Sequence, residues 1–266
     1  MQLTHSDAVR WMERDPGRWL YVLLDLAHPL RQKGVSVYAA DDEDLAYECA
    51  VVTDYAEGVT VRFYGRSMGL LDEALSDPAV RMGTRLCFCG GVPVGFSGKL
   101  TAGGHRFRAD SVGRSLDRFG LYAFQEEHRR VSPPDGWHIR EADPADFEEL
   151  TALERTDWGS FPDEIGEFGA HDRLWLACAA DGILGGYLWA TEAGRAYYDI
   201  VNVFVRRDLR GIGLGKALVS RYAAEAMLRG RRAYYGYAVT RESAAIARSL
   251  GFREIYPETV SYFAVT

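Results

Sequence analysis

The clearest pattern of hydrophobic and polar positions runs from Tyr197 to Gly230. It begins with an almost unbroken apolar run that predicts a buried strand at Tyr197–Val205. A charged corner and the glycine-rich segment Arg210–Lys216 come next. Apolar side chains then recur every four residues, which predicts a helix that ends near Gly230. The pattern therefore predicts a strand, a glycine-rich turn and a helix, in that order.

Similar periodicities predict the other elements of the second half. These are a strand at Trp137–Arg140, a helix opened by Asp143 as N-cap and Pro144, strands at Leu174–Ala179 and Ile183–Ala190, a strand at Arg232–Val239, a helix at Arg241–Leu250 and a last strand near Tyr256–Val265. Pro-Pro and Asp-Gly inside Val131–Gly136 mark the clearest linker. We therefore expect two domains, residues 1–130 and 137–266.

The first half reads as an α/β unit. Its predicted elements are a helix within Leu3–Trp19, a strand at Val35–Ala39, a hairpin of Leu45–Thr53 and Val59–Tyr64, a helix at Met68–Leu75 and a strand at Phe119–Glu126. A second glycine-rich stretch, Gly90–Gly104, is not followed by a helical pattern, so we expect turns there.

Composition narrows the function classes. The chain has 266 residues, of which 47% are hydrophobic and 26% charged, as in globular proteins with a sizeable core. Its net charge of −7 argues against general binding to nucleic acids or acidic membranes. The longest apolar run near the start, Trp19–Leu24, is too short to span a bilayer, and no signal peptide is expected.

The cysteines do not form a disulfide framework or a metal site. There are 4 of them, and Cys87 and Cys89 lie close enough in sequence to suggest a metal pair. No second Cys/His pair lies at the spacing of a zinc finger, so buried thiols are the favoured interpretation and no metal is expected. Free thiols suit a reducing compartment, and we expect a cytoplasmic protein.

The glycine-rich turn has the properties of an anion site. Glycines let the backbone approach a phosphate, and a helix N-terminus offers unpaired N–H groups and the positive end of a dipole. The alternative is a tight turn that only lets the helix pack closely on a sheet. The strand before the turn and the helix after it favour a site for a phosphorylated cofactor.

Three ordered features resemble the GNAT superfamily of acyl-CoA-dependent N-acetyltransferases. Arg210, Gly213 and Gly215 match its Arg/Gln-x-x-Gly-x-Gly/Ala signature. The strand and the Asp-opened helix of 139–147 look like the family's entry segment, and Leu250-Gly251-Phe252 looks like the end of its last helix. Together with the order of elements, the resemblance covers 137–266.

The resemblance implies an α/β (α+β) fold with a mixed, mostly antiparallel twisted sheet flanked by helices. It also implies that the N-terminal domain is a degenerate second copy, as in tandem GNAT and glycine N-acyltransferase-like proteins. In that layout Phe119–Glu126 would complete a shared sheet.

The same resemblance implies acetyl-CoA as acyl donor. Its diphosphate would be bound by backbone N–H groups of the turn, which are those of Arg210, Gly211, Ile212, Gly213, Leu214, Gly215 and Lys216. Its pantetheine arm would pair with a splayed strand edge at Val203, Phe204 and Val205. Lys216, Arg206 and Arg207 either assist a phosphate or are solvated at the corner.

The catalytic candidates lie on the strand before the turn. Asp199 is a carboxylate in an apolar strand, where a raised pKa would suit a general base; a hydrogen-bonded structural role is the alternative. Asn202 would orient a water. Strand alternation places the two on opposite faces unless a bulge intervenes. Glu164 would bind a cationic amine or be solvated.

The general acid departs from the family pattern. The family's common tyrosine, four residues before the Gly of Gly-Phe, is Ala247 in this chain, and Thr240 replaces the common Asn. Tyr235, Tyr237 and Tyr256 are substitutes nearby in sequence, although aromatic residues on strands mostly serve packing. A thiolate also leaves without an acid, because it is a weak base.

The sequence thus favours an N-acyltransferase that moves acetyl from acetyl-CoA to a primary amine of a small molecule. The alternative is a CoA-binding sensor or interaction module that has lost catalysis. We expect no nucleic-acid or membrane partner, and the sequence leaves a homodimer open.

Overall fold

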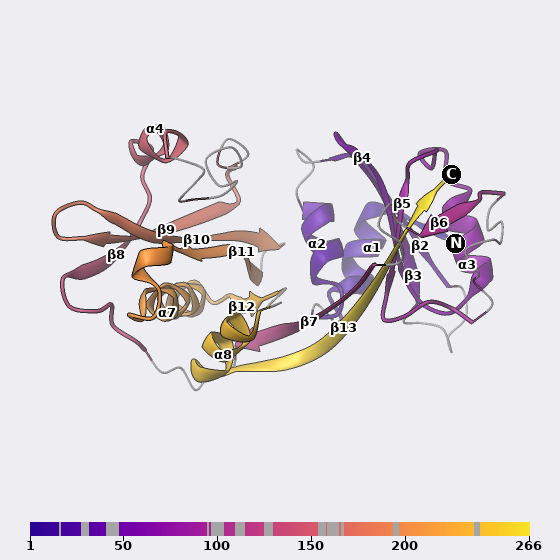
Figure 1. The fold of residues 1–266 in the computed structure, drawn as a ribbon. Helices are drawn as coiled ribbons and strands as arrows, with labels where there is room; N and C mark the ends of the chain where they lie inside the picture. Colours follow the sequence, from indigo (N-terminus) through magenta and orange to yellow (C-terminus); the bar gives the residue numbers. More distant parts are fainter. Residues whose placement is uncertain are drawn as a thin grey trace. The chain divides into compact units, whose positions relative to one another are not determined.

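The computed structural model describes the chain except residues 16, 28–31, 41–47, 95, 97–103, 110–114, 125–129, 154–157, 159–164, 166–167, 194–196 and 237–239. The chain divides into two compact units (Figure 1). Unit 1 contains Met1–Phe119 and Tyr256–Thr266, and unit 2 contains Gly120–Ile255.

Unit 1 has a mixed sheet with helices on both faces. Its helices are α1 (His5–Met12), α2 (Leu20–Ala27) and α3 (Met68–Leu75). Its strands are β1 (Gln2–Leu3), β2 (Gln32–Ala39), β3 (Cys49–Tyr55), β4 (Gly58–Tyr64), β5 (Arg85–Cys89), β6 (Phe107–Ala109) and the last part of β13 (Phe252–Val265). The order is β1-β2-β3-β4-β5-β13, with β6 on β13, and β4–β5 is the parallel pair.

The alternating pattern of β3 explains the layers of unit 1. Ala50 and Val52 belong to the apolar cluster that contains α3, whereas Val51 belongs to the cluster that contains α1 and α2. Successive side chains of a strand point to opposite faces, so one strand contributes to both clusters. The predicted hairpin is present as β3 and β4, paired from Cys49–Tyr64 to Tyr55–Gly58.

Unit 2 repeats this plan. Its helices are α4 (Asp146–Thr151), α7 (Leu214–Leu228) and α8 (Arg241–Ser249), with a 3₁₀ turn η3 (Arg207–Leu209). Its strands are the end of β7 (Ser115–Phe124), β8 (Trp137–Glu141), β9 (Asp172–Ala179), β10 (Leu184–Ala193), β11 (Tyr197–Val205), β12 (Arg232–Tyr235) and the start of β13. The order is β7-β12-β11-β10-β9-β8, in which β11–β12 is parallel and the other pairs are antiparallel.

Alternation on β10 separates the two faces of this sheet. Leu188 and Ala190 pack in the cluster with α7 and α8, whereas Tyr187 and Trp189 pack in the cluster with α4 and Trp158. In Figure 1, α7 and α8 lie on one side of these strands and α4 on the other. The predicted sheet flanked by helices is therefore confirmed in this unit.

Two strands pair with the sheet of the other half of the sequence. Residues 260–264 of β13 pair with β5 in unit 1, and Tyr122 and Ala123 of β7 pair with β12 in unit 2. Phe119–Glu126 was expected to complete a shared sheet, and its residues Tyr122 and Ala123 pair with β12 of unit 2. An apolar pattern predicts a strand but does not say which sheet the strand joins.

Several predicted boundaries differ from the structure; the last strand, for example, was expected near Tyr256–Val265 and begins at Phe252. The helix expected to open at Asp143 and Pro144 begins at Asp146, because both residues form the turn before it and Asp143 accepts a hydrogen bond from Ala145 N–H. The strand expected at Arg232–Val239 is β12, which ends at Tyr235; residues 237–239 lie outside the described part.

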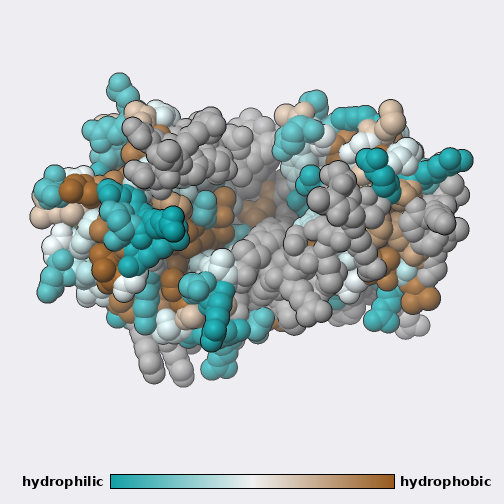
Figure 2. Space-filling model, viewed as in Figure 1, coloured by the Kyte–Doolittle hydropathy of each residue, from teal (hydrophilic) through white to brown (hydrophobic). Residues whose placement is uncertain are grey.

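In the described part of the chain, no helix combines the length and apolar character needed to cross a bilayer. Hydrophilic and hydrophobic residues are mixed over the described surface on the face shown in Figure 2. No group of three or more described His, Cys, Asp or Glu residues has the arrangement of a metal site.

Candidate functional site

Strands β11 and β12 form a fork. On one side β11 pairs with β10 from Tyr197 to Val205. On the other side its described pairing with β12 covers only Tyr197, Tyr198 and Asp199, opposite Arg232, Ala233 and Tyr234. The second half of β11 therefore has a backbone edge that β12 does not cover, and Asp199 lies where the two strands begin to diverge.

A β-bulge at Val201 brings the two catalytic candidates to one face. Across β10, Trp189 lies opposite Asn202 and Thr191 lies opposite Asp199, with the register shift between them. Trp189 and Thr191 are two residues apart on a strand and share a face, so their partners do as well. The extra residue at Val201 thus removes the separation that simple alternation predicts.

Asp199 is a buried carboxylate at the fork. Asp199 is 3% exposed. The N–H of Gly236, just past β12, donates to the Oδ1 atom of Asp199 at 3.1 Å. Burial raises the pKa of Asp199 to about 7, although hydrogen bonds from the backbone N–H groups of Gly236 and Ile200 oppose that rise. The group therefore titrates near neutral pH, as a general base requires.

Asn202 is half-buried on the same face. Its Nδ2 donates to the hydroxyl oxygen of Tyr187 at 3.0 Å. The rings of Tyr187 and Phe204 stack with centroids 5.8 Å apart, and Trp158 packs against Phe204 at 5.6 Å. An aromatic wall thus lies beside Asn202 and fixes the orientation of its amide.

The turn between β11 and α7 depends on two glycines. Gly211 has φ 87° and Gly213 has φ 104°, a left-handed conformation that side chains with a Cβ rarely adopt. Gly213 is the N-cap of α7 and has no side chain to cap the helix. Gly211, Ile212 and Gly213 are exposed to solvent. The first N–H groups of α7 are therefore open to an anion.

Arginine side chains brace the corner before this turn. Arg210 Nε donates to the carbonyl oxygen of Val205 at 3.1 Å, and its guanidinium lies 5.8 Å from the ring centre of Phe204. Arg206 pairs with Asp208 through two contacts and holds the pKa of that carboxyl below its usual value. Among the described residues, Arg207 and Lys216 form no ion pair.

Close packing under the turn also depends on glycine. A Cβ on Gly186 would lie 2.5 Å from the carbonyl oxygen of Phe204, so only glycine lets β10 approach β11 at this point. A Cβ on Gly215 would meet Val205 and Ile246 at an ordinary contact distance of 3.5 Å, so packing does not require glycine at that position. The sequence reasoning did not single out Gly186, although a Gly-Gly pair inside a strand pattern signals such an approach.

The candidate acids fall outside the fork or outside the described part. Tyr235 is buried on the face of α7 and α8, opposite that of Asp199, and its ring packs on Phe252 at 6.3 Å. Ala247 is fully buried in the same cluster. Tyr237 lies outside the described residues, and the side chain of Tyr256 is not described; Glu164, the candidate for binding a cationic amine, also lies outside the described residues.

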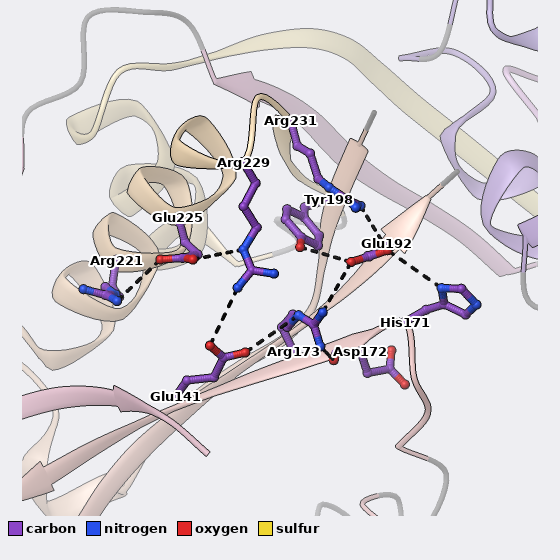
Figure 3. Close-up of polar contacts among 10 residues, drawn as sticks. All are labelled: Glu141, His171, Asp172, Arg173, Glu192, Tyr198, Arg221, Glu225, Arg229 and Arg231. Carbon is purple, nitrogen blue, oxygen red and sulfur yellow. Dashed lines mark hydrogen bonds and ion pairs between the residues drawn. The ribbon is translucent and has the colours of Figure 1, made fainter. Parts of the chain in front are cut away.

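The paired segment of β11 and β12, before the fork opens, is held by an ion network (Figure 3). Glu192 at the end of β10 accepts a hydrogen bond from the hydroxyl of Tyr198 at 3.1 Å and pairs with Arg231 at 3.0 Å. Arg173 and His171 also approach Glu192, each at 3.8 Å. Because Arg231 directly precedes β12 and Tyr198 lies on β11, this network ties the two strands together at their paired end.

Comparisons with known proteins agree with this geometry. Residues 134–252 match the model of the acetyltransferase (GNAT) family. No curated protein matches the chain. The structure resembles a Drosophila protein with a TM-score of 0.64 at 13% identity over 100% of this chain and 98% of that one.

Two further structures carry informative names. A GCN5-related N-acetyltransferase from Kribbella flavida has a TM-score of 0.61 at 14% identity, covering 92% of this chain and 94% of its own. A tandem GNAT protein from the clavulanic acid biosynthesis pathway has a TM-score of 0.57 at 17% identity, covering 100% and 97%. At such identities the likeness concerns the fold, and the chain has a GNAT-like fold of two mixed sheets flanked by helices. Residues 134–252, somewhat less than half of the chain, therefore form a domain that matches the acetyltransferase (GNAT) family model.

Proposed function

We propose that this protein is an acyl-CoA-dependent N-acetyltransferase that transfers acetyl from acetyl-CoA to a primary amine of a small molecule. The observation that carries the proposal is the fork of β11 and β12, which leads directly into the glycine turn at the N-terminus of α7. A buried carboxylate, Asp199, lies at the base of that fork.

The residues present fit acetyl-CoA. The segment from Gly211 to Lys216 forms the turn and the first residues of α7, whose N-terminus has no side-chain cap, and its backbone N–H groups would hold the diphosphate. The uncovered edge of Val203–Val205 offers backbone groups to the amides of the pantetheine arm. Arg207 and Lys216 add positive charge beside the turn.

The chain's own residues would perform the acid–base work. When bound, acetyl-CoA supplies an activated acyl group and a thiolate that leaves as a weak base. Asp199 accepts the proton that the amine loses on attack, directly or through a water held by Asn202. With a pKa of about 7, Asp199 is partly ionised at neutral pH and a good match for this transfer. The thiolate needs no dedicated acid, consistent with alanine at position 247.

The acceptor is proposed to be a small amine because the chain has no feature that predicts a peptide groove. Cys49, Cys87 and Cys178 are buried thiols, which supports the cytoplasm as the proposed location. A second function, a CoA-binding module without catalysis, is favoured by one observation: Ala247 stands where the family often has its tyrosine acid, and it is buried in the core.

Release of free thiol from acetyl-CoA, measured with a panel of small amines, amino acids and peptides, tests the proposal. We expect turnover with at least one small amine. Turnover confined to peptides would contradict the small-molecule acceptor. Binding of acetyl-CoA without turnover across the whole panel would favour the non-catalytic module.

A further inference from the structure

We propose that the hydroxyl of Tyr222 sets the geometry of the β11–β12 fork, which makes Tyr222 a positioning residue for acetyl transfer. This inference rests on the proposed function, because the fork is where the acyl and amine groups would meet. Tyr222 lies in the middle of α7, and nothing in the glycine signature includes it.

The hydroxyl of Tyr222 lies between the two strands. Its oxygen is 2.8 Å from the carbonyl oxygen of Tyr198 on β11 and 2.8 Å from that of Tyr234 on β12. It also accepts a hydrogen bond from the backbone N–H of Tyr234 at 3.1 Å. A hydroxyl has one proton, so it donates to one of these carbonyls at a time while it accepts from Tyr234.

These backbone groups are the ones that a regular ladder would join. In the observed register Tyr198 lies opposite Ala233, and in a regular parallel ladder the N–H of the next residue, Tyr234, can donate to the carbonyl of Tyr198; here it donates to the Tyr222 hydroxyl. The Tyr222 hydroxyl contacts both ends of that link. The hydroxyl therefore bridges the two strands by hydrogen bonds at the last place where they are paired, and we call this bridge the wedge.

The wedge has little freedom to move. Tyr222 is fully buried, and its ring packs edge-on against Trp175 with centroids 6.0 Å apart. Burial also raises the pKa of Tyr222 well above that of a free tyrosine, so its hydroxyl keeps its proton. A protonated, immobile hydroxyl in a core without solvent holds a fixed spacing between the groups it bonds.

The positions that the wedge controls are next to the proposed base. Tyr198 precedes Asp199 in β11, and Tyr234 lies opposite Asp199 in β12. Two residues further along, the N–H of Gly236 donates to the Asp199 carboxylate. A change in the separation of the strands at Tyr222 therefore moves the carboxylate relative to its own hydrogen-bond donor.

The two ends of the paired segment are held by different devices. The Glu192 network fixes the closed end, whereas Tyr222 lies at the opening end. Because Tyr222 belongs to the helix whose N-terminus forms the glycine turn, α7 sets both the fork and the turn. One rigid helix thus relates the position of a bound cofactor to that of the base.

Tyr222→Phe is the test, with Tyr38→Phe as its matched control. Tyr38 is also a buried tyrosine, whose hydroxyl donates to Asp77 at 2.7 Å in unit 1. We expect Y222F to lower kcat about tenfold, because a buried N–H loses its partner and the strands shift. The KM for acetyl-CoA should stay within about twofold, since the turn and its N–H groups are unchanged. Y38F should lower the melting temperature without changing either constant.

Hydrogen exchange gives a readout that does not depend on activity. The amide proton of Tyr234 should exchange at least about tenfold faster in Y222F, and the hydroxyl proton of Tyr222 should be protected in the wild type. A hydroxyl that exchanges freely, or a Y222F variant with unchanged kcat and unchanged Tyr234 exchange, overturns the inference.

The failure of the proposed function looks different. Wild-type protein that releases no thiol with any amine contradicts the proposed function itself. In that case, unchanged exchange at Tyr234 in Y222F also overturns the wedge, whereas faster exchange supports it as the device that sets the fork.

Discussion

The chain contains the same strand–helix–strand arrangement twice, and in the described residues the two copies differ in how far their parallel strands stay paired. In unit 1, β4 and β5 are parallel neighbours connected through α3, as β11 and β12 are connected through α7 in unit 2. The β4–β5 pairing extends to Phe63, next to the end of β4. The β11–β12 pairing ends at Asp199, early in β11. Unit 1 therefore has a closed pair where unit 2 has a fork.

The turns that follow β4 and β11 also differ, in how their backbone N–H groups are bonded. In unit 1, Ser67 caps α3 by accepting the N–H of Leu70 at 3.3 Å, and its own N–H donates to Glu48 at 2.9 Å. The Glu48 carboxylate lies so close to Gly65 that a Cβ there would meet it at 2.7 Å. In unit 2, Gly213 leaves the same groups open. The comparison teaches that a carboxylate and a hydroxyl of the chain bond the backbone N–H groups at the turn of unit 1, whereas no described side chain caps α7 at the turn of unit 2.

The largest effect is expected from removing the charge at the fork. Asp199→Asn keeps an oxygen that accepts the Gly236 N–H but has no basic group, so kcat should fall by about 10²- to 10⁴-fold. Stability near pH 7 should not decrease, because an ionised carboxylate is costly to bury. Steady-state kinetics and thermal unfolding measure both. Asp77→Asn, at a buried carboxylate of unit 1, is the control and should leave kcat unchanged. Full activity in D199N would remove Asp199 as the base.

The second-largest effect tests whether Gly213 is needed for binding acetyl-CoA or only for the left-handed conformation of the turn. Gly213→Ala should weaken acetyl-CoA binding by about tenfold to a hundredfold, because a Cβ disfavours the left-handed conformation and obstructs the approach of a phosphate. Gly83, with φ 85° and free space around it in unit 1, is a matched site of equal strain. Calorimetry should show that Gly83→Ala loses stability but no affinity. Equal losses of affinity in both variants would show that strain alone is responsible.

A pH effect of about tenfold should follow from the same carboxylate. The pKa of Asp199 is about 7 in the folded protein, above the usual value of about 3.9 in an unfolded chain. The folded state therefore binds more protons between about pH 4 and 7, and its stability should fall as pH rises through that window. Activity should change in the opposite direction, with kcat about tenfold lower at pH 6 than on the plateau above 7. A D199N variant that keeps the full stability slope would contradict this assignment.

The smallest effect concerns the turn of unit 1 whose N–H group is bonded by Glu48. Glu48→Ala should reduce the free energy of unfolding by about 1 to 2 kcal/mol, because the N–H of Ser67 loses its acceptor. It should change the affinity for acetyl-CoA by less than about twofold, since β4 and β5 remain paired. Chemical denaturation and calorimetry measure the two quantities. A second binding event that appears in the variant would show that Glu48 alone excludes the ligand.

Sequence reasoning predicted the parts of the site that local rules determine. Arg210–Lys216 was predicted as a turn before a helix because glycines and helical periodicity are visible in the sequence. The bulge at Val201 was foreseen only as a condition, since an extra residue leaves no signal in an apolar run. The role of Glu48 was not predictable, because it accepts a hydrogen bond from the N-cap residue of α3 from a distant point in the chain. The role of the Tyr222 hydroxyl was not predictable either, because the helical spacing of Tyr222 marks it only as a core residue.

Calorimetric titration of the wild-type chain with acetyl-CoA tests the central claim most directly. The account predicts one site per chain with a dissociation constant of tens of micromolar or tighter, about −6 to −7 kcal/mol, and a marked loss of affinity in G213A but not in G83A. The absence of binding, two equivalent sites per chain, or unchanged binding in G213A would contradict it.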